Sequence, residues 1–447
     1  MASRQSSTSS IKSEVKSEFD SSQLSSDQEQ YQTGSSPENG MLDHKVKPQS
    51  KEFVLENSPA STIPNGGFTA WLQVLSGFMC FMSAWGFVNA FGVFQDFYSS
   101  ALIPDVSNSD ISWIGSIQAF LLCSATVFAG PVYDYGHPRF LIILGTILVV
   151  FAHVSSRHLR WARSWMPLPT FDRDRSFLFH TKKAFAMGIA ASGSSLGGVI
   201  YPIVFHRLEP QIGFEWATRV LGFIAFGTLL VPCSCIKART FPKTRRKLLD
   251  FAAFKEPAYA LFNLASFVGF IGLYIPFFYI SAYASEKSGL DETLSFYLLP
   301  IMSAGSIAGR IVPGLVADRV GALNVLGFCT LCASTLGFCW IAIHHAAGGL
   351  IIWALLYGAL SGAFVSLQPT TIASITKDLS TVGGRMGMNT FCASFGILIG
   401  TPIAGLLVES GNWVGMQVFA GATLLGGALL VMATRIAVTG LSVSVKA

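Results

Sequence analysis

One basic side chain interrupts the long apolar stretches of this sequence. Arg310 lies inside an uncharged run, four positions before Gly314. Its guanidinium presents N–H donors in a planar fork that can hold a carboxylate through two parallel hydrogen bonds. A charge within lipid costs roughly 2.5–3.5 kcal/mol, so we expect Arg310 to face an interior site where it could bind an organic anion. The alternative is a side chain that extends to the aqueous boundary, because Asp318 follows only two turns later.

A second group of charged residues stands where apolar runs begin or end. Two runs end in the pattern Gly-x-x-x-Asp, with basic residues close by, and another basic residue opens a later run. Such groups can pair across a loop or cap a neighbouring helix end, and so latch one part of a protein against another. The alternative is a set of plain surface anchors. The candidate gating residues are Asp134, Arg139, Asp318, Arg319 and Arg385.

Residues for catalysis or metal binding are not grouped in any familiar pattern. Cys329 and Cys332 have the spacing of a zinc or redox pair, but no second pair accompanies them. His344 and His345 are adjacent and point to different faces of a helix. No Gly-x-Ser-x-Gly, Walker or Gly-x-Gly-x-x-Gly motif has a credible context. We therefore expect no enzyme activity, no cofactor, no metal and no nucleotide site.

The composition identifies the elements that must position these residues. Hydrophobic residues make up 51% of the 447 residues and charged residues only 12%, whereas soluble domains carry about 25% charged residues. This excludes an ordinary soluble enzyme, a nucleic-acid binder and a disordered scaffold. Apolar runs of membrane-spanning length recur from Ala70 onward, without the alternation of barrel strands. The sequence predicts an all-α integral membrane protein. Its eleven predicted spans are 70–94, 111–133, 138–154, 183–206, 217–236, 257–283, 293–316, 322–343, 347–367, 386–408 and 414–434.

The spans fall into two groups around a basic stretch. Residues 237–255 carry seven Lys and Arg against Asp250 alone, which predicts a cytoplasmic location. The Ser-rich residues before the first span have too few apolar groups to fold. The predicted organisation is a disordered cytoplasmic tail (1–66), an N-terminal bundle (67–236), a basic linker (237–256), a C-terminal bundle (257–436) and a short tail (437–447).

Two landmarks repeat in the same order in both bundles. Gly130-x-x-x-Asp134 ends the second span of the first bundle, and Gly314-x-x-x-Asp318 ends the second span of the other. Later, Lys183 and Arg385 each open a span rich in Gly that contains one Pro. Small residues at such spacings let membrane helices approach closely. The order of the landmarks favours a duplicated architecture.

These motifs resemble those of a known transporter family. Gly314-Leu-Val-Ala-Asp318-Arg319-Val-Gly321 is similar to the loop signature of the major facilitator superfamily. The segments Asn65–Trp71, Trp85–Gln95, Lys182–Gly188 and Tyr274–Ile280 resemble its monocarboxylate porter branch, in the fungal form. The resemblance implies twelve helices in two halves, cytoplasmic termini, and movement of a small organic solute. In the first copy of the signature, Tyr135 replaces the usual basic residue, which predicts a weaker latch.

The resemblance also directs attention to the cavity between the halves. Relatives that couple acid transport to protons carry a Lys near the position of Asn89 and an Asp near that of Ser306, so the usual proton carrier is missing here. Aromatic side chains suit a planar organic solute; those considered are Trp85, Phe87, Tyr201, Tyr274, Phe277, Phe278 and Tyr279. Gln95 and Gln368 are read as hydrated groups at span ends. The candidate substrate-binding residues are Arg310, Asn89, Tyr201, Tyr274 and Phe278.

The first bundle is one helix short of the family pattern. From Asp318 to Arg385 there are 67 positions, but from Asp134 to Lys183 only 49. Residues 155–181 fill this gap with charges and prolines, which predicts that they form no membrane-crossing helix. With the tail inside, five spans would also leave the basic linker outside, against the charge rule. A mis-spliced coding sequence and a natural eleven-helix variant both account for this.

The sequence thus predicts a secondary transporter in the membrane, most simply the plasma membrane. Its partners would be a small organic solute, the lipid bilayer and, if a carrier group exists, a proton, with no nucleic acid and no nucleotide. The solute would be a monocarboxylate-like anion or a secondary metabolite, and export is a candidate direction. A non-transporting membrane sensor on the same fold and a defective transporter form are the alternatives.

Overall fold

The helices follow the apolar runs of the sequence. The structure is a computed structural model that describes residues 67–134, 138–154, 182–236, 251–343, 346–378 and 381–440. The predicted tail (1–66), the segment 155–181 and most of the basic linker lie outside the described residues. The described residues all belong to one compact unit.

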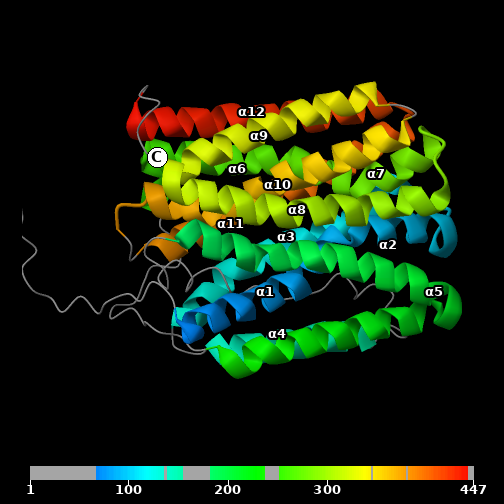
Figure 1. The fold of residues 1–447 in the computed structure, drawn as a ribbon, viewed down its shortest axis with the longest axis horizontal. Helices are drawn as coiled ribbons and strands as arrows, with labels where there is room; N and C mark the ends of the chain where they lie inside the picture. The colour runs from blue at the N-terminus through cyan, green and yellow to red at the C-terminus, as the bar shows by residue number, and fades with distance from the viewer. Residues whose placement is uncertain are drawn as a thin grey trace, which may run out of the picture. The chain divides into compact units, whose positions relative to one another are not determined.

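The first group of helices precedes the basic linker (Figure 1). Its members are α1 (Phe68–Asn89), α2 (Phe91–Phe97), the π-helical turn η1 (Tyr98–Leu102), α3 (Asn108–Asp134), α4 (Pro138–Val154) and α5 (Lys183–Cys235). α5 contains two of the predicted spans, 183–206 and 217–236. The chain turns between them near Gly213, whose φ of 74° suits a residue without a side chain.

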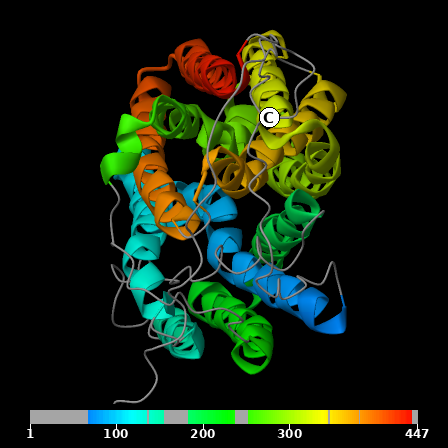
Figure 2. The same ribbon diagram turned by 90° about the vertical axis from the view of Figure 1, so that its left-hand side faces the viewer.

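The second group follows the linker. Its members are the 3₁₀ turn η5 (Phe251–Lys255), α6 (Pro257–Leu273), α7 (Ile275–Glu286), α8 (Glu292–Val320), α9 (Ala322–Cys339), the 3₁₀ turn η6 (Trp340–Ala342), α10 (Ala347–Ile375), α11 (Val382–Glu409) and α12 (Trp413–Thr439). Viewed from one end in Figure 2, the blue-to-green helices α1–α5 lie below and beside the green-to-red helices α6–α12.

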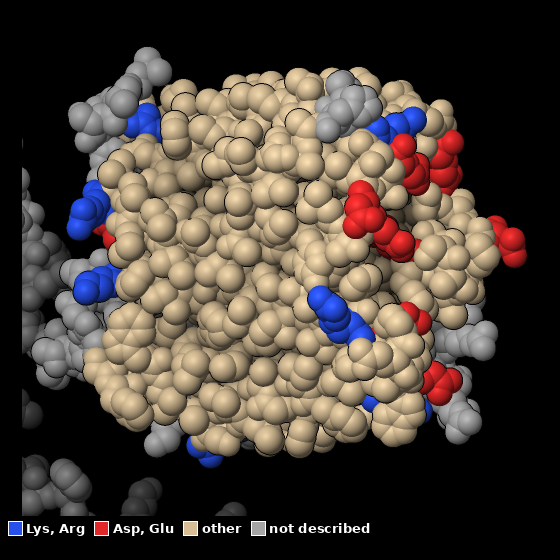
Figure 3. All heavy atoms as spheres, turned by 45° about the vertical axis from the view of Figure 1, so that its right-hand side comes forward, with Lys and Arg blue, Asp and Glu red and all other residues tan. Residues whose placement is uncertain are grey.

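Length and composition make these helices membrane-spanning. Within the described residues, nine helical segments are long and apolar enough to cross a bilayer, and α4 is a shorter apolar helix. Because α5 contains two crossings, these segments make ten, and the shorter α4 brings the described apolar helices to eleven. The predicted all-helical membrane fold is confirmed. On the face shown in Figure 3, a broad band without Lys, Arg, Asp or Glu separates a mainly basic side from a side that carries both acidic and basic groups. Such a band is what a bilayer would surround.

The first span of each group is broken at a similar depth. The α1–α2 run is interrupted at Ala90, and the α6–α7 run at Tyr274. Pro276, in the first turn of α7, cannot donate to the preceding turn, which explains the second break. The matching breaks extend the repeat that the sequence predicts.

The two ends of the bundle are distinguished by their contacts. At the end where α1 begins and α8 ends, here called the inner end, Arg139 Nε donates to the carbonyl of Ile236 at 3.2 Å. At the opposite, outer end, α3 begins beside the end of α11, and the Ser109 amide donates to Glu409 at 2.6 Å. These labels are used for the two ends from here on.

The chain positions on either side of 155–181 lie toward opposite ends. α4 starts at the inner end and runs outward to Val154, whereas Lys183 begins α5 at the inner end, beside Asp318. α5 then turns at Gly213 and returns, so that Ile236 lies at the inner end next to Arg139. Both flanks of the basic linker therefore share the inner end with the start of α1. The parity conflict expected from the span count then concerns only residues 155–181, which lie outside the described residues.

Candidate functional site

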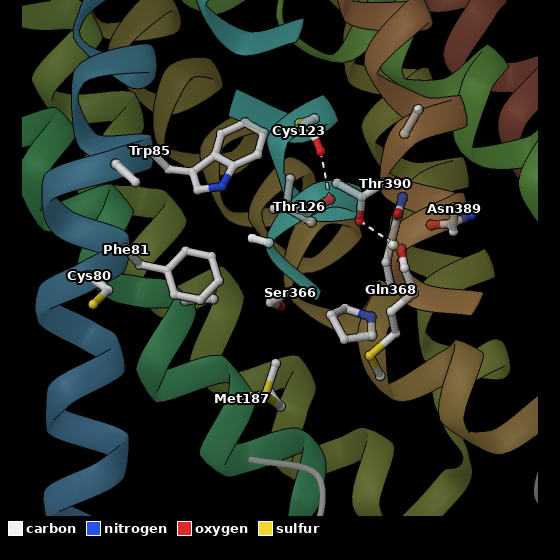
Figure 4. A pocket seen from close by; sticks show the side chains of 18 of the residues that line it. Cys80, Phe81, Trp85, Cys123, Thr126, Met187, Ser366, Gln368, Asn389 and Thr390 are labelled. Atoms are coloured by element: carbon white, nitrogen blue, oxygen red, sulfur yellow. Dashed lines mark hydrogen bonds between the residues drawn. The ribbon is translucent and has the colours of Figure 1, made fainter. Parts of the chain in front are cut away.

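A cavity of about 170 Å³ lies between the two groups of helices. α1, α3, α4 and α5 supply one wall, and α6, α10 and α11 supply the other. Figure 4 shows Phe81 and Trp85 projecting from α1 on one side, Thr126 from α3 behind, and Thr390 from α11 opposite. The cavity reaches toward the inner end, because Gly383 and Met386 in the first turns of α11 belong to its lining.

The outer end of the cavity is closed by contacts between α3 and α11. Ser109 Oγ donates to the carbonyl of Pro402, and the Ser116 and Thr401 hydroxyls are hydrogen-bonded. Gly405 fits directly against Ser109, where a Cβ would lie 2.7 Å from the Ser109 Cα. Farther inward, the ring centroids of Phe120 and Phe395 are 5.1 Å apart. Beyond that pair, toward the inner end, α3 and α11 line the cavity instead of packing against each other.

The contact between α5 and α8, in contrast, runs from one end to the other. At the outer end the ring of His206 stacks on Phe296 at 4.0 Å. In the middle, Ser195 Oγ donates to Ser306 Oγ at 3.1 Å. Near the inner end, a Cβ at Gly188 would lie 2.1 Å from the Arg310 carbonyl oxygen, so the two backbones touch. Toward the inner end, the two helix groups are therefore separated between α3 and α11, while they stay in contact along α5 and α8.

Arg310 is buried inside this α5–α8 contact. Its Nε donates to Ser306 Oγ at 3.2 Å and its Nη1 donates to the Ala191 carbonyl at 3.1 Å. The side chain is 3% exposed, and it does not line the cavity, although Ala191 does. The expectation of an interior location is met, whereas binding of a solute by Arg310 stays a prediction.

The other four predicted substrate-binding residues also lie behind the cavity wall. Asn89 Nδ2 donates to the Ser194 carbonyl at 3.2 Å, and Tyr201 stacks on Phe87 at 4.2 Å. Tyr274 stacks on Trp85 with their ring centroids 6.2 Å apart. Phe278 packs against Phe91 near the outer end, with ring centroids 5.1 Å apart. All four are buried, and none lines the cavity.

Two cavity residues had weaker signals in the sequence. The sequence places Trp85 among seven aromatic candidates and predicts that Gln368 is a hydrated group at a span end. Gln368 instead lines the cavity, is only 7% exposed, and its Nε2 has no hydrogen-bond partner among the described residues. Gln368 directly follows the predicted span 347–367, but α10 continues to Ile375 and so carries Gln368 into the cavity lining.

The gating candidates make different contacts at the inner end. Asp318 of α8 accepts hydrogen bonds from the Ala184 and Phe185 amides, at 3.0 and 3.1 Å. This caps the N-terminus of α5, where a carboxylate is favoured by the helix dipole. Arg139 links α4 to the end of α5, within the first group of helices. Arg319 is exposed at the last turn of α8. The side chain of Asp134 lies outside the described set.

Arg385 pairs with a carboxylate of its own half. Its Nη1 donates to Glu256 Oε2 at 2.8 Å, and its guanidinium lies over the Tyr259 ring at 5.3 Å. The hydrogen bonds and charge of Arg385, together with the charge of Lys377, lower the pKa of Glu256 despite partial burial. Asp318, in contrast, joins the two helix groups through its hydrogen bonds to the α5 amides.

No metal-binding chemistry accompanies this site. In the part of the chain that the structure describes, no three His, Cys, Asp or Glu side chains come close enough to hold an ion. The cavity offers apolar walls, hydroxyls and amides. This arrangement can bind and release an organic solute without covalent change.

The fold and cavity define a class: a multi-pass membrane protein of two helical bundles around a central cavity, built as a solute transporter. The family model of the Major Facilitator Superfamily matches residues 177–358 and 311–442, together more than half of the chain. The chain belongs to the Major Facilitator Superfamily. Its relatives in that family are transporters and not enzymes.

Several fungal transporters are similar in sequence. The MFS-type transporter dbaD of Emericella nidulans is 40% identical over 81% of this chain and 85% of its own length. The aspyridones efflux protein apdF of the same organism is 34% identical, covering 87% and 83%. The agnestins efflux protein AgnL12 of Paecilomyces divaricatus is 35% identical, covering 87% and 93%.

Solved structures share the fold at low sequence identity. The human organic anion transporter MFSD10 superposes with a TM-score of 0.60 at 13% identity, over 81% of this chain and 98% of its own. The E. coli fucose:proton symporter FucP gives 0.59 at 14% identity, over 82% and 98%. These similarities establish the all-helical fold of the family.

Proposed function

We propose that the protein exports a small organic secondary metabolite from a fungal cell by exposing the central cavity alternately to the two sides of the membrane. The observation that carries the proposal is a largely apolar cavity that reaches the inner end while its outer end is closed. The basic linker leaves and re-enters at that inner end, which favours a cytoplasmic orientation. Similarity to two proteins named as efflux proteins supports the direction.

The moving units would be the two predicted bundles, 67–236 and 257–436, joined by the linker 237–256. The plasma membrane is the location that export requires. The segments Trp85–Gln95 and Tyr274–Ile280 support placement in the monocarboxylate porter branch. The first contains the helix break at Ala90 and the second contains the break at Tyr274.

Coupling to protons would not use the position known from acid-transporting relatives. Ser306 accepts hydrogen bonds from Arg310 and Ser195, and Asn89 donates to a backbone carbonyl. Both are uncharged groups engaged in helix packing. This supports a solute that does not exchange a proton with this pair.

Asp318 would act in gating as an anchor of the α5–α8 contact rather than as a latch that breaks on inward opening. Its bonds to the α5 amides are present while the cavity reaches the inner end. Arg385 and Glu256 would stabilise the start of α11, one wall of the open side.

Deletion of the gene in its host, followed by mass spectrometry of cells and medium, tests export. We expect one or a few compounds to accumulate in cells and to decrease in the medium. Re-expression of the normal chain should restore the partition, whereas Gly387→Trp should not, because Gly387 lines the cavity and has open space at its Cβ position.

Gly384→Trp is the matched control for this experiment. Gly384 also has open space, lies one turn earlier on α11 and does not line the cavity, so its variant should restore export. An unchanged partition of every compound after gene deletion would contradict the proposed function.

A further inference from the structure

We infer that the cavity binds its solute in an uncharged form, as a flat molecule that presents carbonyl or ether oxygens to Trp85 and Gln368. The inference rests on the proposed function and specifies the substrate class of the same cavity. It also distinguishes the solute from the carboxylate anion that Arg310 predicts.

The first observation is the lack of ionised groups around the cavity. The described residues that line it include no carboxylate, ammonium, guanidinium or imidazole group. A solute anion would leave water for an apolar space without a counter-charge on the wall, and such a transfer is strongly unfavourable. An uncharged solute meets no such cost.

The second observation concerns Arg310, a buried cation behind the wall. Its guanidinium already donates to Ser306 Oγ and to the Ala191 carbonyl, between α5 and α8. Reaching a solute would require this side chain to leave the contact that joins the two helices. The cavity wall at that point consists of Ala191.

The third observation is the kind of hydrogen-bonding groups that remain available. Thr126 and Thr390 donate to carbonyls of their own helices, at 2.6 and 2.9 Å, so their hydroxyl protons are engaged. Gln368 Nε2 and Trp85 Nε1 have no hydrogen-bond partner in the described part of the chain. The other polar side chains of the lining are also engaged in hydrogen bonds within the protein; they are Ser83, Thr146, Ser366 and Asn389. The side-chain N–H donors without a partner are therefore two nitrogens, which select oxygen acceptors on the solute.

The fourth observation is the set of aromatic planes. Trp85 lies nearly parallel to Tyr274, with an interplanar angle of 13° at 6.2 Å, and Tyr274 is in turn stacked on Phe270. Trp85, Phe270 and Phe81 line the cavity. Figure 4 shows two of them, Trp85 and Phe81, beside α1. Supported rings of this kind favour a planar solute. Together with the two donors, they define a site for a flat, uncharged oxygen acceptor.

Equilibrium binding to the full chain in lipid nanodiscs tests the inference. The probes are radiolabelled methyl 2-naphthoate, which is uncharged, and 2-naphthoate at neutral pH, which has the same ring system with a charged carboxylate. We expect saturable binding of the ester and binding of the carboxylate that is at least about tenfold weaker. A carboxylate that binds as tightly as the ester would overturn the inference, as would an ester that does not bind saturably.

Variants identify the donors. Gln368→Met keeps the length of the side chain and removes its amide, and Trp85→Phe keeps a ring and removes the N–H. Each should weaken ester binding about three- to tenfold. Gln417→Met is the matched control, because Gln417 is also a buried glutamine with an unpartnered Nε2 but lies on α12, away from the cavity lining. Its ester binding should equal that of the normal chain.

Gel-filtration profiles and ligand-free thermal unfolding show whether each variant is folded. Folded Gln368→Met and Trp85→Phe proteins with unchanged ester binding would overturn the assigned donors. Because the ester-to-carboxylate ratio is measured on the normal chain, the substrate class is tested even if a variant misfolds. A tight carboxylate with intact export overturns only the inference, whereas a selective ester with no export phenotype overturns only the proposed function.

Discussion

The Arg310 guanidinium is held by two oxygen atoms between α5 and α8, and this arrangement determines what its replacement would do. Burial removes the hydration of a charged group. Hydrogen bonds to neutral groups compensate for only part of the lost hydration free energy. Its contribution to folding is therefore small or negative, while its bonds fix the relative position of two helices. The two effects can be separated by choice of substitution.

Arg310→Met should leave thermal stability within about 1 kcal/mol of the normal chain, because an unbranched apolar side chain replaces a buried charge. Arg310→Ala should lose about 2–4 kcal/mol, because it leaves a cavity. Thermal unfolding in nanodiscs measures both. We expect Arg310→Met to bind methyl 2-naphthoate normally, and a tenfold loss of that affinity would favour the role of direct solute anchor.

Glu256 gives a prediction for pH. Hydrogen bonds and charge from Arg385 lower its pKa in the folded protein, so the pair stabilises the fold above the pKa of the unfolded chain and is lost as pH falls through the folded value. The Glu256 side chain is 45% exposed, so solvent screening limits the effect to about 1 kcal/mol or less. Glu256→Gln should lower stability at pH 7 and make no difference well below pH 4.

Thermal unfolding of the normal chain and Glu256→Gln, measured from pH 3 to 8, checks this prediction. High salt should shrink the difference at pH 7. A difference that grows as pH falls would contradict the assigned sign.

Among the elements, α5 and α8 depend on bare backbone where they meet. Gly188 faces the Arg310 carbonyl, and Gly314 faces the Ala184 carbonyl. Such close approach is how membrane helices gain van der Waals contact without a hydrophobic driving force. One methyl group at this contact should therefore separate the helices.

Gly188→Ala should destabilise the protein by about 1–3 kcal/mol, since a Cβ there would lie 2.1 Å from backbone oxygen. Gly227→Ala is the control on the same helix: nothing lies within 4 Å of its Cβ position, and Ala should be neutral or up to about 1 kcal/mol stabilising. Thermal unfolding compares the two, and equal stability would mean that the close α5–α8 contact contributes nothing.

Asp318→Asn removes the charge that caps α5 and replaces one acceptor oxygen by a donor, which cannot bond to an amide N–H. The lost interaction is worth about 0.3–2 kcal/mol. We expect ester binding to persist while the export rate falls, because Asp318 touches α5 and not the cavity. Binding in nanodiscs and export from cells are measured in parallel, and equal loss of both would indicate misfolding.

The elements themselves were largely predictable, because a bilayer demands long apolar helices and the chain supplies them. The predicted spans 111–133 and 138–154 correspond closely to α3 and α4. The turn at Gly213 lies in the gap between the predicted spans 183–206 and 217–236. The break at Ala90 was not predictable, since no Pro or Gly marks that position and tertiary packing decides the local backbone.

The cavity residues were less predictable than the helices. Residue type indicated that Arg310 and Tyr274 were interior, and both are buried. Which face of a buried helix meets a cavity depends on the rotation of that helix, and an all-round apolar helix gives no periodic signal for it. Tyr274 thus lies directly behind Trp85, one layer from the cavity.

For the whole molecule, the positions on either side of 155–181 set the topology. Val154 lies in the outer half and Lys183 at the inner end. A cysteine at Ser176, in a chain without its native cysteines, should react with an impermeant thiol reagent from only one side of the membrane. Because position 176 is close in sequence to Lys183, we expect labelling from the cytoplasmic side.

A cysteine at Asp105, in the loop between η1 and α3 at the outer end, is the control for this experiment. It should react from the extracellular side alone. Labelling of position 176 from the extracellular side would contradict the orientation deduced from α5.

The unequal contacts along the two sides of the cavity have a mechanical consequence. Because the part of α5 before Gly213 touches α8 from one end to the other, whereas α3 and α11 separate beyond Phe120 and Phe395, we expect the line between α5 and α8 to act as a hinge axis. Displacement about a hinge grows with distance from its axis. The inner ends of α3 and α11 should therefore travel farthest during each cycle, and distance probes placed there will report nearly all of the motion, while probes across α5 and α8 will stay almost silent.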